Sequence, residues 1–262
     1  MFKYFCSSDI HSFYDEWIHA LQEKGFDITN PEHRVIVCGD LFDRGEKSVE
    51  CLTFMRHLCN AGRGIYIRGN HEDLLFECVD SLNNKKHLGQ HHISNGTIKT
   101  ISQITGVNEY DILSGCYDRK NFNSKISDIL SFIEGDSKNY FQLGSTIFVH
   151  GWIPCYQGLE DFRQASKKDW EEARWDNGME MWKYPRCRPE GKTVVCGHWH
   201  CSWGWSHIRQ KRKEFPQKNH RDWEKSFEPF IDDGIVAIDA CTAYTDIVNV
   251  CVFDENGKLI GG

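Results

Sequence analysis

The sequence predicts an α/β protein built on two β-sheets. Short apolar, strand-like runs alternate with helix-period segments in the first third of the chain, and strand signals return after a largely helical middle. Crossover helices between successive strands favour parallel pairing. No repeat of fixed period and no low-complexity tract marks a second unit, so residues 1–262 are expected to form one domain.

The elements are expected in a definite order. Phe13, Trp17 and Leu21 recur at helical spacing, and the apolar runs on either side are short enough for strands. The first third predicts strands at 2–7, 35–38 and 64–67 and helices at 13–24, 48–60 and 72–82. The second half predicts strands at 140–143, 146–150, 193–196, 235–240 and 247–253, with turns at Gly144-Ser145 and Asn256-Gly257.

Two segments differ from the rest in composition. Residues 83–135 are polar and punctuated by glycine, and they predict a helical cap or insertion whose best helix lies at 122–134. Residues 207–230 form a basic loop, rich in lysine and arginine between Arg209 and Lys225. A solvated loop is the expected explanation, and an electropositive lip that attracts an anionic substrate is the alternative.

Composition excludes several classes of protein. Apolar residues make up 40% of the chain, but no run approaches the roughly 18 apolar residues of a membrane span. The short apolar run at 1–8 lacks the core and cleavage site of a secretory signal, so a cytoplasmic location is expected. The net charge of −7 argues against a stable nucleic-acid complex. The 12 cysteines include no Cys-x-x-Cys pair, so reduced thiols are expected.

Acidic, amide and imidazole side chains collect just beyond the expected strand ends. In an open α/β sheet, the loops at the carboxyl ends of parallel strands converge into a ligand crevice. The blocks are Asp9-Ile10-His11, Gly39-Asp40-Leu41-Phe42-Asp43-Arg44-Gly45, Arg68-Gly69-Asn70-His71-Glu72, His150-Gly151 and Gly197-His198-Trp199-His200.

These blocks indicate a site for two metal ions. A carboxylate such as Asp40 can bridge two cations, and Asp9 and His11 can reach one ion where the backbone leaves a strand. Mixed oxygen and imidazole donors suit manganese, and also iron or zinc, better than calcium or magnesium. A purely structural role for the set is disfavoured, because burying it without ions leaves charge uncompensated.

The blocks resemble the calcineurin-like metallophosphoesterases, and within them the bacterial and phage serine/threonine protein phosphatases of the phosphoprotein phosphatase family. The family pattern Asp-x-His, Gly-Asp-x-x-Asp-Arg-Gly, Gly-Asn-His-Glu, His-Gly and Gly-His occurs here in order over residues 4–200. Ile238-Asp239 and the last strands resemble the family's C-terminal sheet. The resemblance implies two mixed β-sheets packed as a sandwich and flanked by helices, in four layers.

The resemblance also implies a role for each site residue. The implied metal ligands are Asp9 and His11 for the first ion, Asp40 as the bridge, and Asn70, His150 and His198 for the second ion. A hydroxide that bridges the two ions would attack a phosphomonoester directly, and Arg44 and Asn70 would bind the phosphate. His71, oriented by Asp43, would protonate the leaving group as general acid.

The chain departs from the family pattern at several positions. The segment 94–100 resembles an Asn-Gly-Gly-x-x-Thr loop over the site, which places Asn95 at the substrate and puts Thr97 where a glycine is usual. Asn177 stands where a second phosphate-binding arginine is usual, so Arg174 is the candidate replacement. His200 extends the last block to Gly-His-x-His, which completes the first metal site in more distant metallophosphoesterases.

Two enzymatic functions remain open at this point. The first is a serine/threonine-type phosphatase that acts on a phosphorylated peptide or protein. The alternative is a hydrolase of dinucleoside polyphosphates such as diadenosine tetraphosphate, favoured by Asn177 and by abundant tryptophans that can stack a purine. The acidic charge disfavours a nuclease, and the presence of Asp40 and His71 disfavours a binding module without activity. His91 and His92 are expected on a surface loop.

Overall fold

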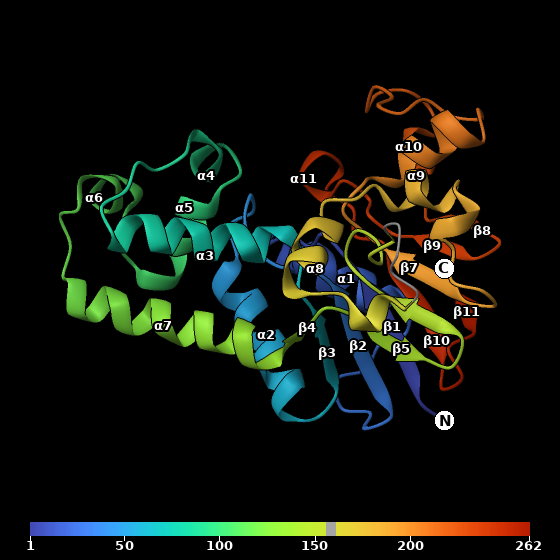
Figure 1. Cartoon of the computed structure of the whole chain (residues 1–262), viewed down its shortest axis with the longest axis horizontal. Coiled ribbons are helices and arrows are strands. Elements are labelled where there is room, and N and C mark those ends of the chain that lie inside the picture. Colours follow the sequence, from blue (N-terminus) through green and yellow to red (C-terminus); the bar gives the residue numbers. More distant parts are fainter. Residues whose placement is uncertain (156–160) are drawn as a thin grey trace.

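A six-stranded sheet forms one half of a β-sandwich in the computed structural model, which describes residues 1–155 and 161–262 (Figure 1). Its strand order is β11-β10-β1-β2-β3-β4, with β1 to β4 parallel and β10 and β11 antiparallel. The bounds are β1 Lys3–Ser7, β2 His33–Cys38, β3 Gly64–Ile67, β4 Ser137–Lys138, β10 Cys251–Asp254 and β11 Leu259–Gly261.

A five-stranded sheet forms the other half, in the order β5-β6-β7-β9-β8. Its central strands β6, β7 and β9 run parallel, and the edge strands β5 and β8 pair antiparallel with them. The bounds are β5 Phe141–Leu143, β6 Thr146–Phe148, β7 Thr193–Cys196, β8 Phe230–Asp232 and β9 Ile235–Ala237. Both sheets are mixed, as the resemblance implied.

Buried apolar side chains from both sheets fill the space between them. Ile36, Ile67, Phe148, Val195 and Val236 belong to this cluster, and none of them is more than 3% exposed. Burial of apolar area at about 25 cal/mol per Å² makes this interface the main contribution that holds the sandwich together. Separate apolar clusters cover the outer face of each sheet, so the molecule has four layers.

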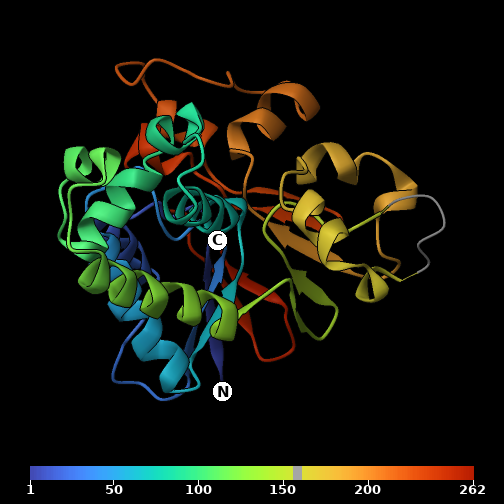
Figure 2. The ribbon, with the colours of Figure 1, turned by 60° about the vertical axis from the view of Figure 1, so that its left-hand side comes forward.

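Helices cover both outer faces of the sandwich (Figure 2). The first sheet is covered by α1 Tyr14–Glu23, α2 Ser48–Asn60, α3 Asn70–Asn83, α4 Gln90–Ser94, α5 Thr97–Thr105, α6 Glu109–Ser114 and α7 Arg119–Asp136. The second sheet carries α8 Lys167–Ala173, α9 Gly178–Trp182 and α10 Cys201–Trp203, while α11 Thr242–Thr245 follows β9.

The expected cap is a helical bundle that shares its core with the first sheet. Ile101 of α5 and Ile129 of α7 lie in the same buried cluster as Val35 and Val37 of β2. Helix α7 begins at Asp118, whose side chain caps the first turn, and it leads directly into β4 beside β3. The cap is therefore attached to the sheet edge at both of its ends, through α3 and through β4 (Figure 1).

The predicted elements of the first third are confirmed to within three residues, but the later strands are shorter than expected. The strand expected at 247–253 begins only at Cys251, and the one at 235–240 ends at Ala237. The short strands β4, β8 and β11 are absent from the sequence-based prediction, because two or three residues at a sheet edge carry no readable alternation.

The basic loop does not present a uniformly positive surface. Arg209 pairs with Asp232, Arg212 lies 2.9 Å from Glu228, and Lys218 lies 3.1 Å from Asp246. Acidic partners therefore neutralise part of its charge. Across the two described ranges, no helix is both long enough and apolar enough to cross a membrane.

Gly39 lies where two loops at the sheet edge approach each other closely. It has a φ of +81°, and a Cβ atom there would lie 2.7 Å from the Cα of Gly69. Gly25 has a similar φ of +84° but no atom within 4 Å of its Cβ position.

We predict that Gly25→Ala lowers the free energy of unfolding by about 1 kcal/mol through backbone strain alone. Gly39→Ala should lower it by about 3 kcal/mol or more, because the added methyl group also collides with its neighbours. Urea denaturation measures both, and equal losses would contradict the packing described here.

Candidate metal centre and active site

The candidate site lies where loops from both sheets meet. Asp9, Asp40, Asn70, His150 and His198 each follow the end of a parallel strand by two or three residues. Backbone hydrogen bonds tie these loops together: the Asp9 amide donates to the Gly39 carbonyl at 3.1 Å and the Gly197 amide to the His150 carbonyl at 2.7 Å. The structure thus brings residues from five strands to one edge of the sandwich.

The backbone of this edge is strained. Most residues with side chains avoid positive φ, which costs of order 1–3 kcal/mol per residue. Six of the predicted site residues nevertheless adopt it: Asp9, His11, Asp40, Asp43, Arg44 and His198. The loops hold these conformations because close packing and hydrogen bonds fix them, and such strain is typical of functional sites.

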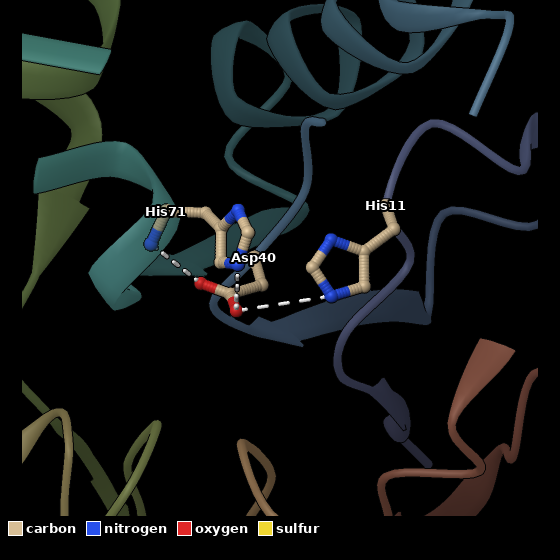
Figure 3. Close-up of side chains that lie close together, drawn as sticks. All are labelled: His11, Asp40 and His71. Atoms are coloured by element: carbon tan, nitrogen blue, oxygen red, sulfur yellow. Dashed lines mark hydrogen bonds and ion pairs between the residues drawn. The ribbon is translucent and has the colours of Figure 1, made fainter. Parts of the chain in front are cut away.

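The Asp40 carboxylate faces two groups of side chains. Its Oδ2 lies 3.9 Å from His11 Nε2 and 3.8 Å from His71 Nε2 (Figure 3). Its Oδ1 lies 3.4 Å from His150 Nε2, and His198 completes that second group. Within each group the donor atoms lie no more than 4.8 Å apart. A carboxylate that faces a donor group on each side is able to bridge two cations.

The imidazoles present their free nitrogens to this space. His11 Nδ1 donates to the Phe42 carbonyl at 3.0 Å, and His150 Nδ1 donates to the Cys38 carbonyl at 2.7 Å. These bonds direct the Nε2 lone pairs inward, as the hydrogen bond on the other ring nitrogen does for metal-bound histidines. His150 Nε2 lies 2.7 Å from Asn70 Oδ1, and an imidazole nitrogen and an amide oxygen so close together can both bind one cation. The residues present therefore fit a metal centre.

Burial sets the ionisation of the donors. It raises the pKa of Asp9 to about 6, and it also raises the pKa of Asp40. Burial lowers the pKa of His11 and His150, and that of His198 to about 2, so their rings are neutral at pH 7. Neutral imidazoles and ionised carboxylates are the metal-binding forms, and a bound cation stabilises both together.

His71 and Asp43 form a buried pair beside this centre. His71 Nδ1 lies 2.7 Å from Asp43 Oδ2, which leaves Nε2 facing the site. Burial lowers the pKa of His71, but Asp40 and the hydrogen-bonded Asp43 outweigh it, so the pKa is raised overall. Thr97 donates to Asp43 Oδ2 at 2.9 Å and Thr100 to Oδ1 at 2.8 Å. The cap therefore fixes the carboxylate that orients His71.

Sequence reasoning missed two further acidic residues. Glu72 had no expected role, but its buried carboxylate accepts from the amides of Gly69, Asp40 and Leu41 at 2.7, 3.0 and 2.9 Å. It thereby joins the loops after β2 and β3. Asp239 is 5% exposed, and burial together with the nearby Asp9 holds its pKa well above its usual value. The available signal was that Glu72 ends one of the site blocks and that Asp239 follows the end of β9 by two residues.

Arg44 and Asn95 lie at the mouth of the site. The exposed Arg44 places its Nη2 3.3 Å from His71 Nε2. The turn after Asn95 packs against the Arg44 backbone, since a Cβ at Gly96 would lie 2.6 Å from the Arg44 nitrogen. Arg44 therefore lies beside His71, and Asn95 is adjacent in sequence to the turn that packs against the Arg44 backbone.

The structure does not bring Arg174 or His200 to the donor groups. The buried guanidinium of Arg174 donates to Asp73 of α3 and to Asn139 in the loop before β5, each at 2.6 Å. These bonds connect the end of α8 to both segments. His200 turns away from the centre: its Nδ1 lies 2.7 Å from Ser202 Oγ and its Nε2 3.6 Å from Glu214. Both side chains are engaged elsewhere, so we propose neither Arg174 as a phosphate-binding residue nor His200 as a metal ligand.

Comparison with known proteins decides the family. The model of the calcineurin-like phosphoesterases matches residues 2–229. The chain belongs to this family. In this family, hydrolysis depends on a dinuclear metal centre, and the His and Asp groups around Asp40 are able to hold metals.

Two bacterial relatives match about a quarter of this chain. The asymmetrical bis(5'-nucleosyl)-tetraphosphatase of Bacillus velezensis is 40% identical over 75 residues, which cover 26% of this chain and 30% of that protein. Its Bacillus subtilis counterpart is 43% identical over 75 residues, covering 26% and 31%. The match therefore spans under a third of these relatives. The cold-active protein-tyrosine phosphatase of a psychrophilic Shewanella species shares the fold, with 15% identity, a TM-score of 0.55, and coverage of 99% of this chain and 77% of that one.

Metal content tests the ligand assignment. We predict that Asp40→Asn lowers the manganese bound per chain by at least one equivalent, because both donor groups share this carboxylate. His200→Asn should bind as much manganese as the unmodified protein, since His200 faces Ser202 and Glu214. Elemental analysis after desalting measures both. Loss of metal from the His200 variant alone would show that the expected Gly-His-x-His ligand set is the correct one.

Proposed function

We propose that this protein is a metal-dependent hydrolase whose substrate is a dinucleoside polyphosphate. The site observation that supports this substrate is a pair of exposed indole rings beside the second donor group. The names of the tetraphosphatase relatives support it independently. The serine/threonine-type phosphatase, which the resemblance placed first, becomes the second candidate.

The two indoles flank His198. Trp175 is 51% exposed with its ring 5.7 Å from the His198 ring, and Trp199 is 36% exposed at 6.5 Å. Exposed aromatic rings are surfaces on which bases stack, at about 1–3 kcal/mol per base. A substrate whose phosphates occupy the donor edge would place a base within reach of these rings.

The metal ligands of this proposal are Asp9, His11, Asp40, Asn70, His150 and His198. His11, His150 and His198 belong to the donor groups around Asp40, Asn70 contacts His150, and Asp9 accepts from the His198 amide. Manganese is our proposed metal, with iron or zinc as alternatives, because the set mixes oxygen and nitrogen donors. Two such ions, when bound, polarise the phosphoryl oxygens and lower the pKa of water so that a nucleophile is available at neutral pH.

The chain's own residues supply binding and proton transfer. Arg44, exposed at the mouth, pairs with the non-bridging oxygens and offsets the charge that grows on them. His71 is the general acid of this proposal: Asp40 and the hydrogen-bonded Asp43 raise its pKa, which favours the protonated ring that can donate to the departing oxygen. Thr97 and Thr100 hold Asp43, and through it the ring of His71, in place.

The second candidate rests on the His71–Asp43 pair. A seryl or threonyl alkoxide is a poor leaving group that needs a proton, and this pair is built to deliver one. A phosphate leaving group, as in a dinucleotide, needs less help. The two candidates therefore differ in how strongly they depend on His71.

Turnover of two substrates tests the proposal. Purified protein with manganese should show a higher kcat/KM for diadenosine tetraphosphate than for a phosphoserine peptide. A higher value for the peptide would favour the second candidate. No turnover of either would exclude both.

The indole pair is tested by substitution. We predict that Trp199→Ala raises KM for diadenosine tetraphosphate by roughly 5- to 100-fold, which corresponds to the loss of one stacked base. Its KM for a small aryl phosphate should not change. Tyr110→Ala, a matched loss of an aromatic ring 78% exposed on α6, is the control and should leave both values unchanged. An equal effect of the tryptophan change on both substrates would remove the case for base stacking.

The role of His71 is tested through the leaving group. His71→Asn should lower kcat for the phosphoserine peptide by about 10²- to 10⁴-fold, the usual contribution of a general acid. The loss for diadenosine tetraphosphate should be smaller, because its leaving group is a weaker base. Metal content, measured on the same samples, should stay constant. Equal losses on both substrates would mean that His71 acts by another route.

A further inference from the structure

A second cluster of potential metal ligands lies on the cap, away from the site around Asp40. Glu77 extends from α3, and His91 and His92 lie on the short helix α4. His91 Nε2 and His92 Nε2 lie 3.4 and 3.5 Å from the same oxygen, Glu77 Oε1. All the donor atoms of the group lie within 4.8 Å of one another.

His92 is the residue that needs explanation. The sequence suggested a surface position, but the structure corrects this: the side chain is only 1% exposed. Neither of its ring nitrogens has a hydrogen-bond partner. A buried polar group without a partner costs about 1–3 kcal/mol, so such groups call for a ligand. Its nitrogen faces the two other donors of the cluster.

The distances match those between ligands of one metal ion. Two ligands about 2.1 Å from zinc at a tetrahedral angle lie about 3.4 Å apart. Hydrogen bonds from an imidazole to a carboxylate are shorter, at about 2.7–3.2 Å. Glu77 and His91 are 57% and 47% exposed, so an ion can enter from solvent, and water can fill the fourth position.

We propose that Glu77, His91 and His92 form an additional divalent-metal site, suited to zinc, that cross-links helix α3 to helix α4. Two histidines and one carboxylate are a recurrent zinc ligand set. The site differs from the Asp40 centre in all of its residues, and it does not depend on which substrate the enzyme cleaves.

The position of this site gives it a structural consequence. Helix α3 begins with Asn70 and His71, and α4 leads through Gly96 into α5, which carries Thr97 and Thr100. A zinc ion on Glu77, His91 and His92 would fasten these two elements to each other. It would thereby stabilise the hydroxyls that hold Asp43 relative to the helix that carries His71.

Zinc binding to the full-length protein tests the proposal. After treatment with chelator, the protein is loaded with zinc alone, desalted and analysed for metal. The unmodified protein should retain one more zinc per chain than Glu77→Gln or His91→Asn. Zinc bound at the Asp40 centre should be equal in all three proteins, so it does not contribute to this difference. Both changed residues are exposed, so folding, checked by circular dichroism, should be preserved.

His19→Asn is the matched control. His19 forms an exposed pair with Glu23 at 3.3 Å, but it lies in no group of three potential ligands among the described residues. This variant should retain as much zinc as the unmodified protein. Amide exchange adds a second readout: zinc should slow exchange across 90–105 in the unmodified protein and not in His91→Asn. Equal zinc content in all variants would overturn the site, and zinc binding without this protection would overturn the cross-link.

Discussion

The carboxylate of Asp40 is the point on which the rest of the site depends. It is buried, it faces histidines on both sides, and it lies in a loop whose backbone is held at positive φ. Such a charge is costly in a protein interior unless it is paired or bound to a cation. Glu72 fixes the Asp40 amide, and Asp40 in turn accepts from the His71 amide at 2.9 Å. The position of the carboxylate thus determines where the neighbouring loops can lie.

The sandwich makes this position possible. Parallel strands of two different sheets end at the same edge, so residues far apart in the sequence are brought together without any long loop. His198, for example, donates its amide to Asp9 Oδ2 at 2.9 Å although 189 residues separate them. The apolar layer between the sheets fixes the distance between these strand ends. The arrangement of the candidate site residues is therefore a consequence of how the apolar layer packs.

Sequence patterns located the loops that meet at Asp40, but they did not reveal the contacts that surround these loops. Asp40 and His71 follow strands whose apolar runs are easy to read, and glycine-flanked blocks mark the loops. By contrast, the hydroxyls of Thr97 and Thr100 reach Asp43 across more than fifty residues, and no local pattern encodes such a contact. The same holds for Arg174, whose partner Asp73 lies 101 residues away.

The hairpin of β8 and β9 shows a second reason why the fold could not be predicted fully from the sequence. Asp233 and Gly234 connect the two strands, and Gly234 has a positive φ of +82°. The Asp-Gly pair was readable as a turn, but a three-residue strand beside it was too short to be recognised. His92 shows that one residue of a polar segment can still be buried while its neighbour His91 stays exposed, because burial depends on how α4 packs against α3.

We propose that Asp40 would serve two metal ions, one in each of the donor groups that it faces. Anomalous diffraction from crystals of the manganese-loaded protein measures this most directly. We expect two peaks, one on each side of the Asp40 carboxylate, the first near His11 and the second near His150 and His198. A single peak, or peaks that Asp40 does not contact, would contradict it.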